Sequence, residues 1–191
     1  MAFGYRGDVK SERWVRSLTL FAVGRLVKML TVLFLSAFLF VSQTTDSTLP
    51  PSGAHVVYLT AGHGVQIYEC MQQGSGFAWI FQAPVAKLFD LSTHKQVGTH
   101  GAGPVWTWQD GSSVSGKVLV KAPSPDSASI PWLLLSATPS ESPAGALSKV
   151  TLVRRSDTHG GDAPSTGCDV EHAGRSLRVP YTAIYSFYSV Q

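Results

Sequence analysis

Short apolar runs separated by clusters of Gly, Pro, Ser and Asp recur from position 55 to the end of the chain. The runs are rich in Val, Ile, Tyr, Trp and Phe, a composition typical of β-strands. They predict strands at 55–60, 65–70, 77–82, 86–90, 96–99, 105–109, 113–121, 130–137, 147–154 and 178–190. Ten short strands with frequent turns indicate an all-β domain, either an antiparallel β-sandwich or a small barrel.

The segment 113–121 has the clearest alternation of apolar and polar positions. Val114, Val118 and Val120 are predicted to share one face, and Ser or Lys occupies the other. A period of two is the pattern of a strand buried on one side. Asp110-Gly111, just before this segment, is a strong signal for a hairpin turn.

The N-terminal region resembles an export signal. An uncharged apolar run of 13 residues, Met29 to Val41, follows a cationic stretch. A secretory signal needs about 7–15 apolar residues, whereas a spanning helix needs about 20. We therefore expect a signal peptide at 1–42, a Thr/Ser/Pro linker at 43–53 and a single domain at 54–191, in a secreted or periplasmic protein. An uncleaved signal anchor reaching back to Leu18 is the alternative, although Arg25 and Lys28 would interrupt it.

The excess of positive charge also belongs to the leader. Residues 1–42 carry six basic and two acidic side chains, whereas residues 43–191 carry nine basic and ten acidic ones. A nucleic-acid-binding domain needs a cationic face to neutralise phosphates. No nucleic acid partner is expected, and membrane contact is expected only through the leader, if it is not cleaved.

A polar segment of about 19 residues, Asp157 to Arg175, is predicted to be a long loop. Loops longer than about 12–15 residues are usually functional or held in place. Cys168 lies in this loop, and the only other cysteine is Cys70. In an exported protein two cysteines most simply form a disulfide, which we predict here. Two unpaired buried thiols are the alternative.

Several short motifs follow one another along the chain in the same order as in a known family. The first half contains Gly98-x-His100-x-Ala102-Gly103-Pro104-x-Trp106, preceded by Gln66-Ile67-Tyr68 with Cys70 and followed by Asp110-Gly111-Ser112. The second half contains Ile130-Pro131-Trp132-Leu133-Leu134-Leu135, Gly167-Cys168-Asp169 and Val179-Pro180-Tyr181-Thr182-Ala183. Together they resemble an uncharacterised domain-of-unknown-function family of exported bacterial and fungal proteins. The resemblance spans about 54–188 and implies no catalytic residues. Gly101 departs from the aromatic residue usual after the family's His, and the family has no fixed His at the position of His159.

Two enzyme classes are excluded by spacing. Some fungal relatives carry a malate dehydrogenase label, but a dinucleotide site needs G-x-G-x-x-G between a strand and a helix. The glycines at 98, 101 and 103 are wrongly spaced, and they precede Pro104 and a Trp-rich strand. A serine hydrolase needs G-x-S-x-G at a strand-to-helix turn. The segment 111–116 misses that pattern by one position.

Histidines and tryptophans supply the remaining candidate sites. All six His residues follow the leader, so a metal site using His100 and His159 is considered, although the spacing matches no compact zinc motif. Trp106 and Trp108 share one face of a strand and could form either core or an aromatic binding platform with His100.

We expect a non-catalytic envelope or extracellular binding module without a cofactor, with a glycan or an envelope component as partner. The alternative is a secreted metal-assisted hydrolase that uses His100 and the 157–175 loop.

Overall fold

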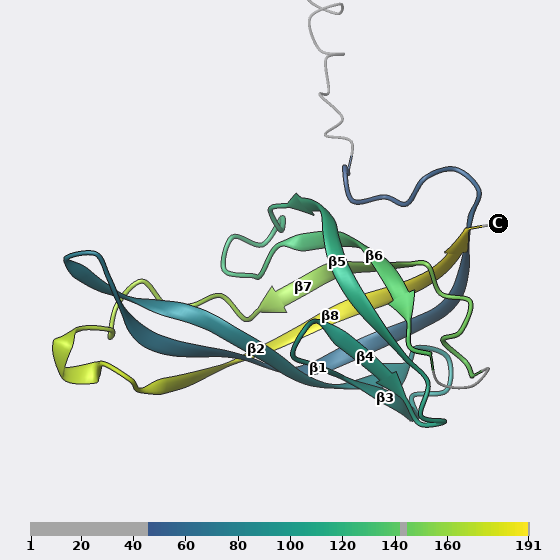
Figure 1. Ribbon diagram of the computed structural model, residues 1–191. Helices are drawn as coiled ribbons and strands as arrows, with labels where there is room; N and C mark the ends of the chain where they lie inside the picture. The colour runs from purple at the N-terminus through teal and green to yellow at the C-terminus, as the bar shows by residue number, and fades with distance from the viewer. Residues whose placement is uncertain (1–45, 142–144, 191) are drawn as a thin grey trace, which may run out of the picture. The chain divides into compact units, whose positions relative to one another are not determined.

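A computed structural model describes residues 46–141 and 145–190 (Figure 1). The predicted leader at 1–42 and the first residues of the predicted linker lie outside these ranges. No helix within them has the length and apolar character needed to cross a membrane.

Eight antiparallel strands form one closed barrel, so the predicted all-β fold is confirmed. Each strand pairs with the next in sequence, and the last strand pairs with the first. The strands are β1 (Ala54–Gln73), β2 (Gly76–Asp90), β3 (Gln96–Gly101), β4 (Val105–Trp108), β5 (Ser113–Ala122), β6 (Trp132–Pro139), β7 (Leu152–Gly160) and β8 (Ser176–Val190). A short 3-10 turn, η2 (Val170–His172), lies between β7 and β8.

The prediction of ten strands is corrected because two pairs of predicted strands are continuous. The segments 55–60 and 65–70 both belong to β1, and the segments 77–82 and 86–90 both belong to β2. β1 continues through Gly62 and Gly64, and β2 continues through Pro84. The two glycines do not break β1, because they lie where neighbouring chains approach it closely. A Cβ atom at position 62 would lie 2.5 Å from the ring of Tyr185, and one at position 64 would lie 2.1 Å from the carbonyl oxygen of Val85. Small residues are therefore required there for packing.

β7 begins and ends later than predicted. Leu147 and Val150 are fully buried, but they lie in the connection before the strand. The strand then runs to Gly160 with an irregularity between Ser156 and His159. The predicted loop from Asp157 is therefore partly strand, and the connection to β8 begins only after Gly160.

The predicted valine face of β5 is correct only for its first part. Val114 is buried in the barrel interior, but the pairing register shifts between Val118 and Val120. A bulge adds one residue and reverses which side chains face inward. Val120 consequently packs outside, against a small cluster formed by Leu134, Leu152 and Tyr188.

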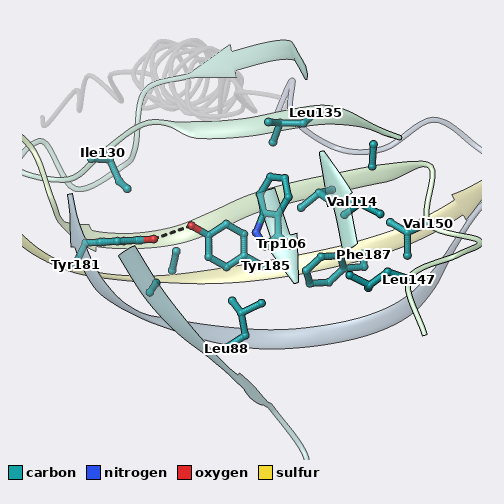
Figure 2. Close-up of a cluster of buried hydrophobic side chains, with 14 residues drawn as sticks. Leu88, Trp106, Val114, Ile130, Leu135, Leu147, Val150, Tyr181, Tyr185 and Phe187 are labelled. Atoms are coloured by element: carbon teal, nitrogen blue, oxygen red, sulfur yellow. Dashed lines mark hydrogen bonds between the residues drawn. The ribbon is translucent and has the colours of Figure 1, made fainter. Parts of the chain in front are cut away.

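The barrel interior is packed with aromatic and aliphatic side chains (Figure 2). Trp106, Tyr185 and Phe187 are among the largest fully buried side chains. The Trp106 ring meets both Tyr185 and Phe187 edge to face, with centroids 5.8 and 6.3 Å apart. Buried aromatic pairs of this kind add about 0.5–1.5 kcal/mol each beyond the area they bury.

The described chain begins with a segment that packs on the outside of the barrel. The Thr48 side chain is fully buried, and its hydroxyl accepts a hydrogen bond from Nε of Arg154 at 3.2 Å. Arg154 also forms an ion pair with Asp46. Residues 46–48 of the predicted linker are therefore attached to β7.

The end of β1 and the starts of β2 and β8 extend beyond the rest of the barrel (Figure 1). The disulfide between Cys70 and Cys168 is confirmed and joins this extension to the connection before β8. Two backbone hydrogen bonds support the same contact: the N–H of Cys70 donates to Arg175 at 2.9 Å, and that of Gly174 donates to Cys70 at 2.8 Å. The connection is thus fixed to β1.

Candidate functional site

A pocket of about 510 Å³ lies in one end of the barrel. This is the end from which the β1–β2 hairpin extends, because the pocket walls include Phe81 of β2, the β3–β4 turn, the end of β5 and the start of β6. Its volume falls within the range of about 300–1,000 Å³ that is usual for small-molecule sites. The lining residues with hydrogen-bonding or charged side chains include Gln66, Tyr68, His100, Trp106, Lys121, Arg155, Asp162 and Tyr185.

His100 projects from β3 into the barrel and is 4 % exposed. Its Nδ1 lies 3.0 Å from the carbonyl oxygen of Val105, on the neighbouring strand β4. A carbonyl can only accept, so Nδ1 carries the proton and Nε2 is the free acceptor of a neutral ring. Burial lowers the pKa of His100 to about 4; the bond to Val105 opposes this shift, and the charge of Arg155 adds to it.

Trp106 lies directly beside His100 on β4. The two rings are stacked, with centroids 4.5 Å apart and planes 7° from parallel. The indole Nε1 of Trp106 is buried and has no hydrogen-bond partner among the described residues. A buried unsatisfied N–H costs about 1–3 kcal/mol, so such groups are often found where a ligand or water completes the bond.

Gln66 of β1 adds a second unsatisfied donor. Its side chain is 2 % exposed and lines the pocket, and Nε2 has no partner within the described part of the chain. Tyr68, two residues further along β1, is satisfied because its hydroxyl donates to the carbonyl oxygen of Gly161 at 2.7 Å. Gln66 is therefore the polar side chain of β1 that a ligand could satisfy.

A pair of tyrosines from β8 lies in the barrel interior. The hydroxyl groups of Tyr181 and Tyr185 are 3.0 Å apart and hydrogen-bond to each other (Figure 2). Burial raises the pKa of both phenols, so both are neutral and protonated near pH 7. Tyr185, which lines the pocket, therefore supplies a hydroxyl group to the site and no charge.

Arg155 of β7 brings a positive charge to the wall of the pocket. Its Nε and Nη2 atoms both donate to the carbonyl oxygen of Pro131, at 3.1 and 2.8 Å. Among the described residues no carboxylate lies within 4.0 Å of the guanidinium. Asp162 lines the same pocket but is exposed to solvent. The guanidinium of Arg155 is thus oriented by a neutral carbonyl group, and its charge has no carboxylate partner among the described residues.

A second hollow, of about 620 Å³, lies on the outer side of the wall formed by β1 to β4. Its lining includes the exposed side chains of His63, Lys87 and Arg178, together with the buried His100 that also lines the inner pocket. The inner pocket instead holds buried polar groups that have no partner within residues 46–141 and 145–190. The inner pocket is therefore the better candidate for a specific site.

The structure places the predicted site residues in different surroundings. His100 and Trp106 both line the inner pocket. Trp108 packs in the core against Tyr58 and Phe187, with ring centroids 4.9 and 5.4 Å away. His159 is exposed at the surface, and its Nδ1 lies 3.7 Å from Asp126.

No group of three or more His, Cys, Asp or Glu side chains within residues 46–141 and 145–190 is arranged to hold a metal ion.

Sequence reasoning missed Gln66 and Arg155. Gln66 belongs to a motif shared with the family, but a glutamine neither titrates nor acts as a nucleophile, so nothing in the sequence indicated a binding role. The Arg154-Arg155 pair is visible in the sequence, and successive residues of a strand point to opposite faces. That alternation could have placed one arginine inside the barrel.

The lowered pKa of His100 predicts a loss of stability on mild acidification. The unfolded chain takes up a proton at this residue near pH 6.5, whereas the folded protein does so only near pH 4. The unfolded state then binds more protons, so stability falls as the pH drops through this interval. We expect a contribution of about −2 kcal/mol to the free energy of unfolding between pH 7.5 and pH 5.

Denaturant titrations of the wild-type protein and of His100→Gln at the two pH values measure this contribution. The substituted protein should lose about 2 kcal/mol less than the wild type on acidification. An equal loss in both proteins would show that His100 is not the group responsible.

A family model described as "Protein of unknown function (DUF3455)" matches residues 51–189. This range includes every strand of the barrel almost completely, and the chain belongs to this family. The resemblance inferred from the motifs is thereby confirmed. No curated protein and no solved structure matches the chain.

Proposed function

We propose that this member of the family is an exported, non-catalytic binding module that holds a small molecule in the inner pocket of its barrel. The observation that carries the proposal is that one pocket lining holds two buried N–H donors, Gln66 Nε2 and Trp106 Nε1, for which the described residues offer no partner. Small-molecule sites typically combine apolar walls with a few such polar groups. Export is supported by the disulfide, since disulfides persist mainly in oxidising compartments.

The burial of the aromatic side chains favours a small apolar ligand over a glycan. A sugar ring needs an accessible aromatic face on which to stack. The Trp106 ring is 1 % exposed and is stacked on His100. Phe81, at the mouth of the pocket, is 50 % exposed and contacts Tyr68 edge to face. The pocket therefore offers an exposed apolar side chain at its mouth and buried polar groups further inside.

The hydrolase alternative has less support. His100 is the only histidine that lines the inner pocket. The histidines of the 157–175 segment, His159 and His172, lie instead beside surface carboxylates. His100 can accept a hydrogen bond through Nε2, but no nucleophile paired with it is found among the described residues. Binding without catalysis is therefore the function we propose.

Fluorescence titration with 1-aminoanthracene, a neutral apolar dye, tests the proposal. Val118 lines the pocket and is 49 % exposed, so Val118→Trp should narrow the pocket without disturbing the core. The matched control is Leu119→Trp, at a 55 % exposed position that is not part of the lining. We expect saturable binding that weakens about tenfold or more in Val118→Trp and stays unchanged in Leu119→Trp. Equal affinity in all three proteins would contradict the proposal.

A further inference from the structure

We infer that the ligand of the inner pocket is an apolar molecule with one carboxylate group, and that this carboxylate binds Arg155. The inference rests on the proposed function, because it assigns the chemical class of the molecule that the pocket holds. Three features support it: the guanidinium edge that is not used by the Pro131 contact, the absence of a carboxylate partner among the described residues, and two unsatisfied donors in the same pocket lining.

The hydrogen bonds of Arg155 fix the orientation of its guanidinium. Nε and Nη2 donate to the same oxygen of Pro131, so one edge of the planar group is held against the start of β6. None of the hydrogen bonds in the described ranges uses Nη1. Arginine presents five N–H donors in a rigid fork that fits the two oxygens of a carboxylate. The edge formed by Nη1 and the second N–H of Nη2 is thus left for a ligand.

Arg154, the preceding residue, differs from Arg155 because it is paired with a carboxylate. Its side chain points to the outer face, where it forms an ion pair with Asp46 and lies over the Trp132 ring at 5.2 Å from the centroid. Arg155 faces the interior, where it donates to the carbonyl oxygen of Pro131, lies close to the Tyr185 side chain and has no carboxylate partner among the described residues. Burying a charge without a partner is costly, so an opposite charge bound beside a partly buried arginine stabilises it. The difference between neighbours marks Arg155 as a binding group.

The other charges that line the pocket leave a net positive site. Lys121 adds a second positive charge, Asp162 adds one negative charge, and both side chains are exposed at the mouth. The neutral state of His100 at pH 7 adds none. A ligand with a single negative charge therefore balances the lining, whereas a cation would be repelled by Arg155.

The unsatisfied donors also favour a ligand that brings acceptors. Gln66 Nε2 and Trp106 Nε1 can only donate, and both belong to the same lining as Arg155. A carboxylate offers about four lone-pair sites and no donor when ionised. The rest of the lining includes the apolar side chains of Phe81, Leu133 and Leu135. This combination fits an apolar body that ends in a carboxylate.

Displacement of bound 1-aminoanthracene by three amphiphiles with the same ten-carbon chain tests the inference. Decanoate is negative, decan-1-ol is neutral and decyltrimethylammonium is positive, so only the head group varies. We expect Arg155→Gln to weaken decanoate binding about tenfold or more and to change decan-1-ol binding less than about twofold. Arg154→Gln is the matched control and should leave both affinities unchanged.

A second variant covers the case in which Arg155→Gln does not fold. Arg155→Lys keeps the charge but cannot donate to Pro131 and present a two-pronged edge at once. We expect it to bind decanoate about fivefold more weakly than the wild type does, with decan-1-ol again nearly unchanged.

The outcomes separate the inference from the proposed function. If 1-aminoanthracene binds saturably but the Arg155 variants bind decanoate as the wild type does, the carboxylate inference is wrong and the proposed binding function stands. Stronger binding of decyltrimethylammonium than of decanoate would also overturn the inference. If neither the dye nor any amphiphile binds, the proposed function and the inference fail together.

Discussion

Replacing Cys70 and Cys168 together by alanine should reduce the free energy of unfolding by about 4 kcal/mol. The disulfide joins residues 98 positions apart, so it excludes a large set of extended conformations from the unfolded chain. The chain-entropy model gives roughly 4–5 kcal/mol for a loop of that length, and the loss of a native disulfide from a small secreted domain typically costs about 2–5 kcal/mol. The effect is large beside a typical total stability of about 5–15 kcal/mol.

Urea denaturation of the wild-type and double-alanine proteins measures this effect. Reduction of the wild-type protein with dithiothreitol is the control, since it breaks the same bond without changing a side chain. Both treatments should shift the midpoint in the same direction and by a similar amount. A loss below about 1 kcal/mol in the double variant would show that backbone hydrogen bonds alone hold the segment before β8 to β1.

Gly64→Ala should destabilise the barrel by about 3 kcal/mol, which is unusual for the addition of one methyl group. A Cβ atom at this position would lie 2.1 Å from the carbonyl oxygen of Val85 and 2.5 Å from the Cα of Ala86. Both atoms belong to the backbone of β2, so no side-chain rotation can relieve the contact. The strands would have to separate where β1 is paired with both β2 and β8.

Gly101→Ala is the matched control for this substitution. A Cβ atom there meets nothing within 4 Å, and the residue lies at the end of β3 without a positive φ. Thermal unfolding should show a large decrease in melting temperature for Gly64→Ala and almost none for Gly101→Ala. Similar melting temperatures for the two variants would mean that β1 and β2 are not packed as closely as the structure shows.

The strands were predictable because their apolar runs alternate with turn residues, but their lengths were not. Gly62, Gly64 and Pro84 are residues that usually interrupt a strand. Here the glycines allow Tyr185 and the backbone of β2 to approach β1, which is a property of the tertiary packing. Such a reason cannot be obtained from the local pattern, so the sequence predicted ten strands where the described residues form eight.

The reversed face of β5 has a similar cause. The alternation through Val114 and Val118 is correct, but a bulge before Val120 turns the remaining side chains around. Residues 118–120 include no glycine or proline that would indicate a bulge. It becomes visible only when the partner strand β6 is in place.

The candidate site was predictable in part. His100 and Trp106 stand in the motif shared with the family, and they line the pocket. The importance of Arg155 could not be inferred, because Arg154 and Arg155 differ only in the face of β7 to which they point. Which face is inward depends on the closure of the barrel and on the ion pair with Asp46.

The indole N–H signal of Trp106 in a ¹H–¹⁵N NMR spectrum tests the central claim most directly. The indole Nε1 atoms of Trp106 and Trp132 are both buried without a partner among the described residues, but only Trp106 lines the pocket, whereas Trp132 lies beneath Arg154. Signals are assigned from Trp106→Phe and Trp132→Phe proteins. Addition of decanoate should shift the Trp106 signal and leave that of Trp132 in place. A shift of the Trp132 signal with an unchanged Trp106 signal would contradict binding inside the barrel.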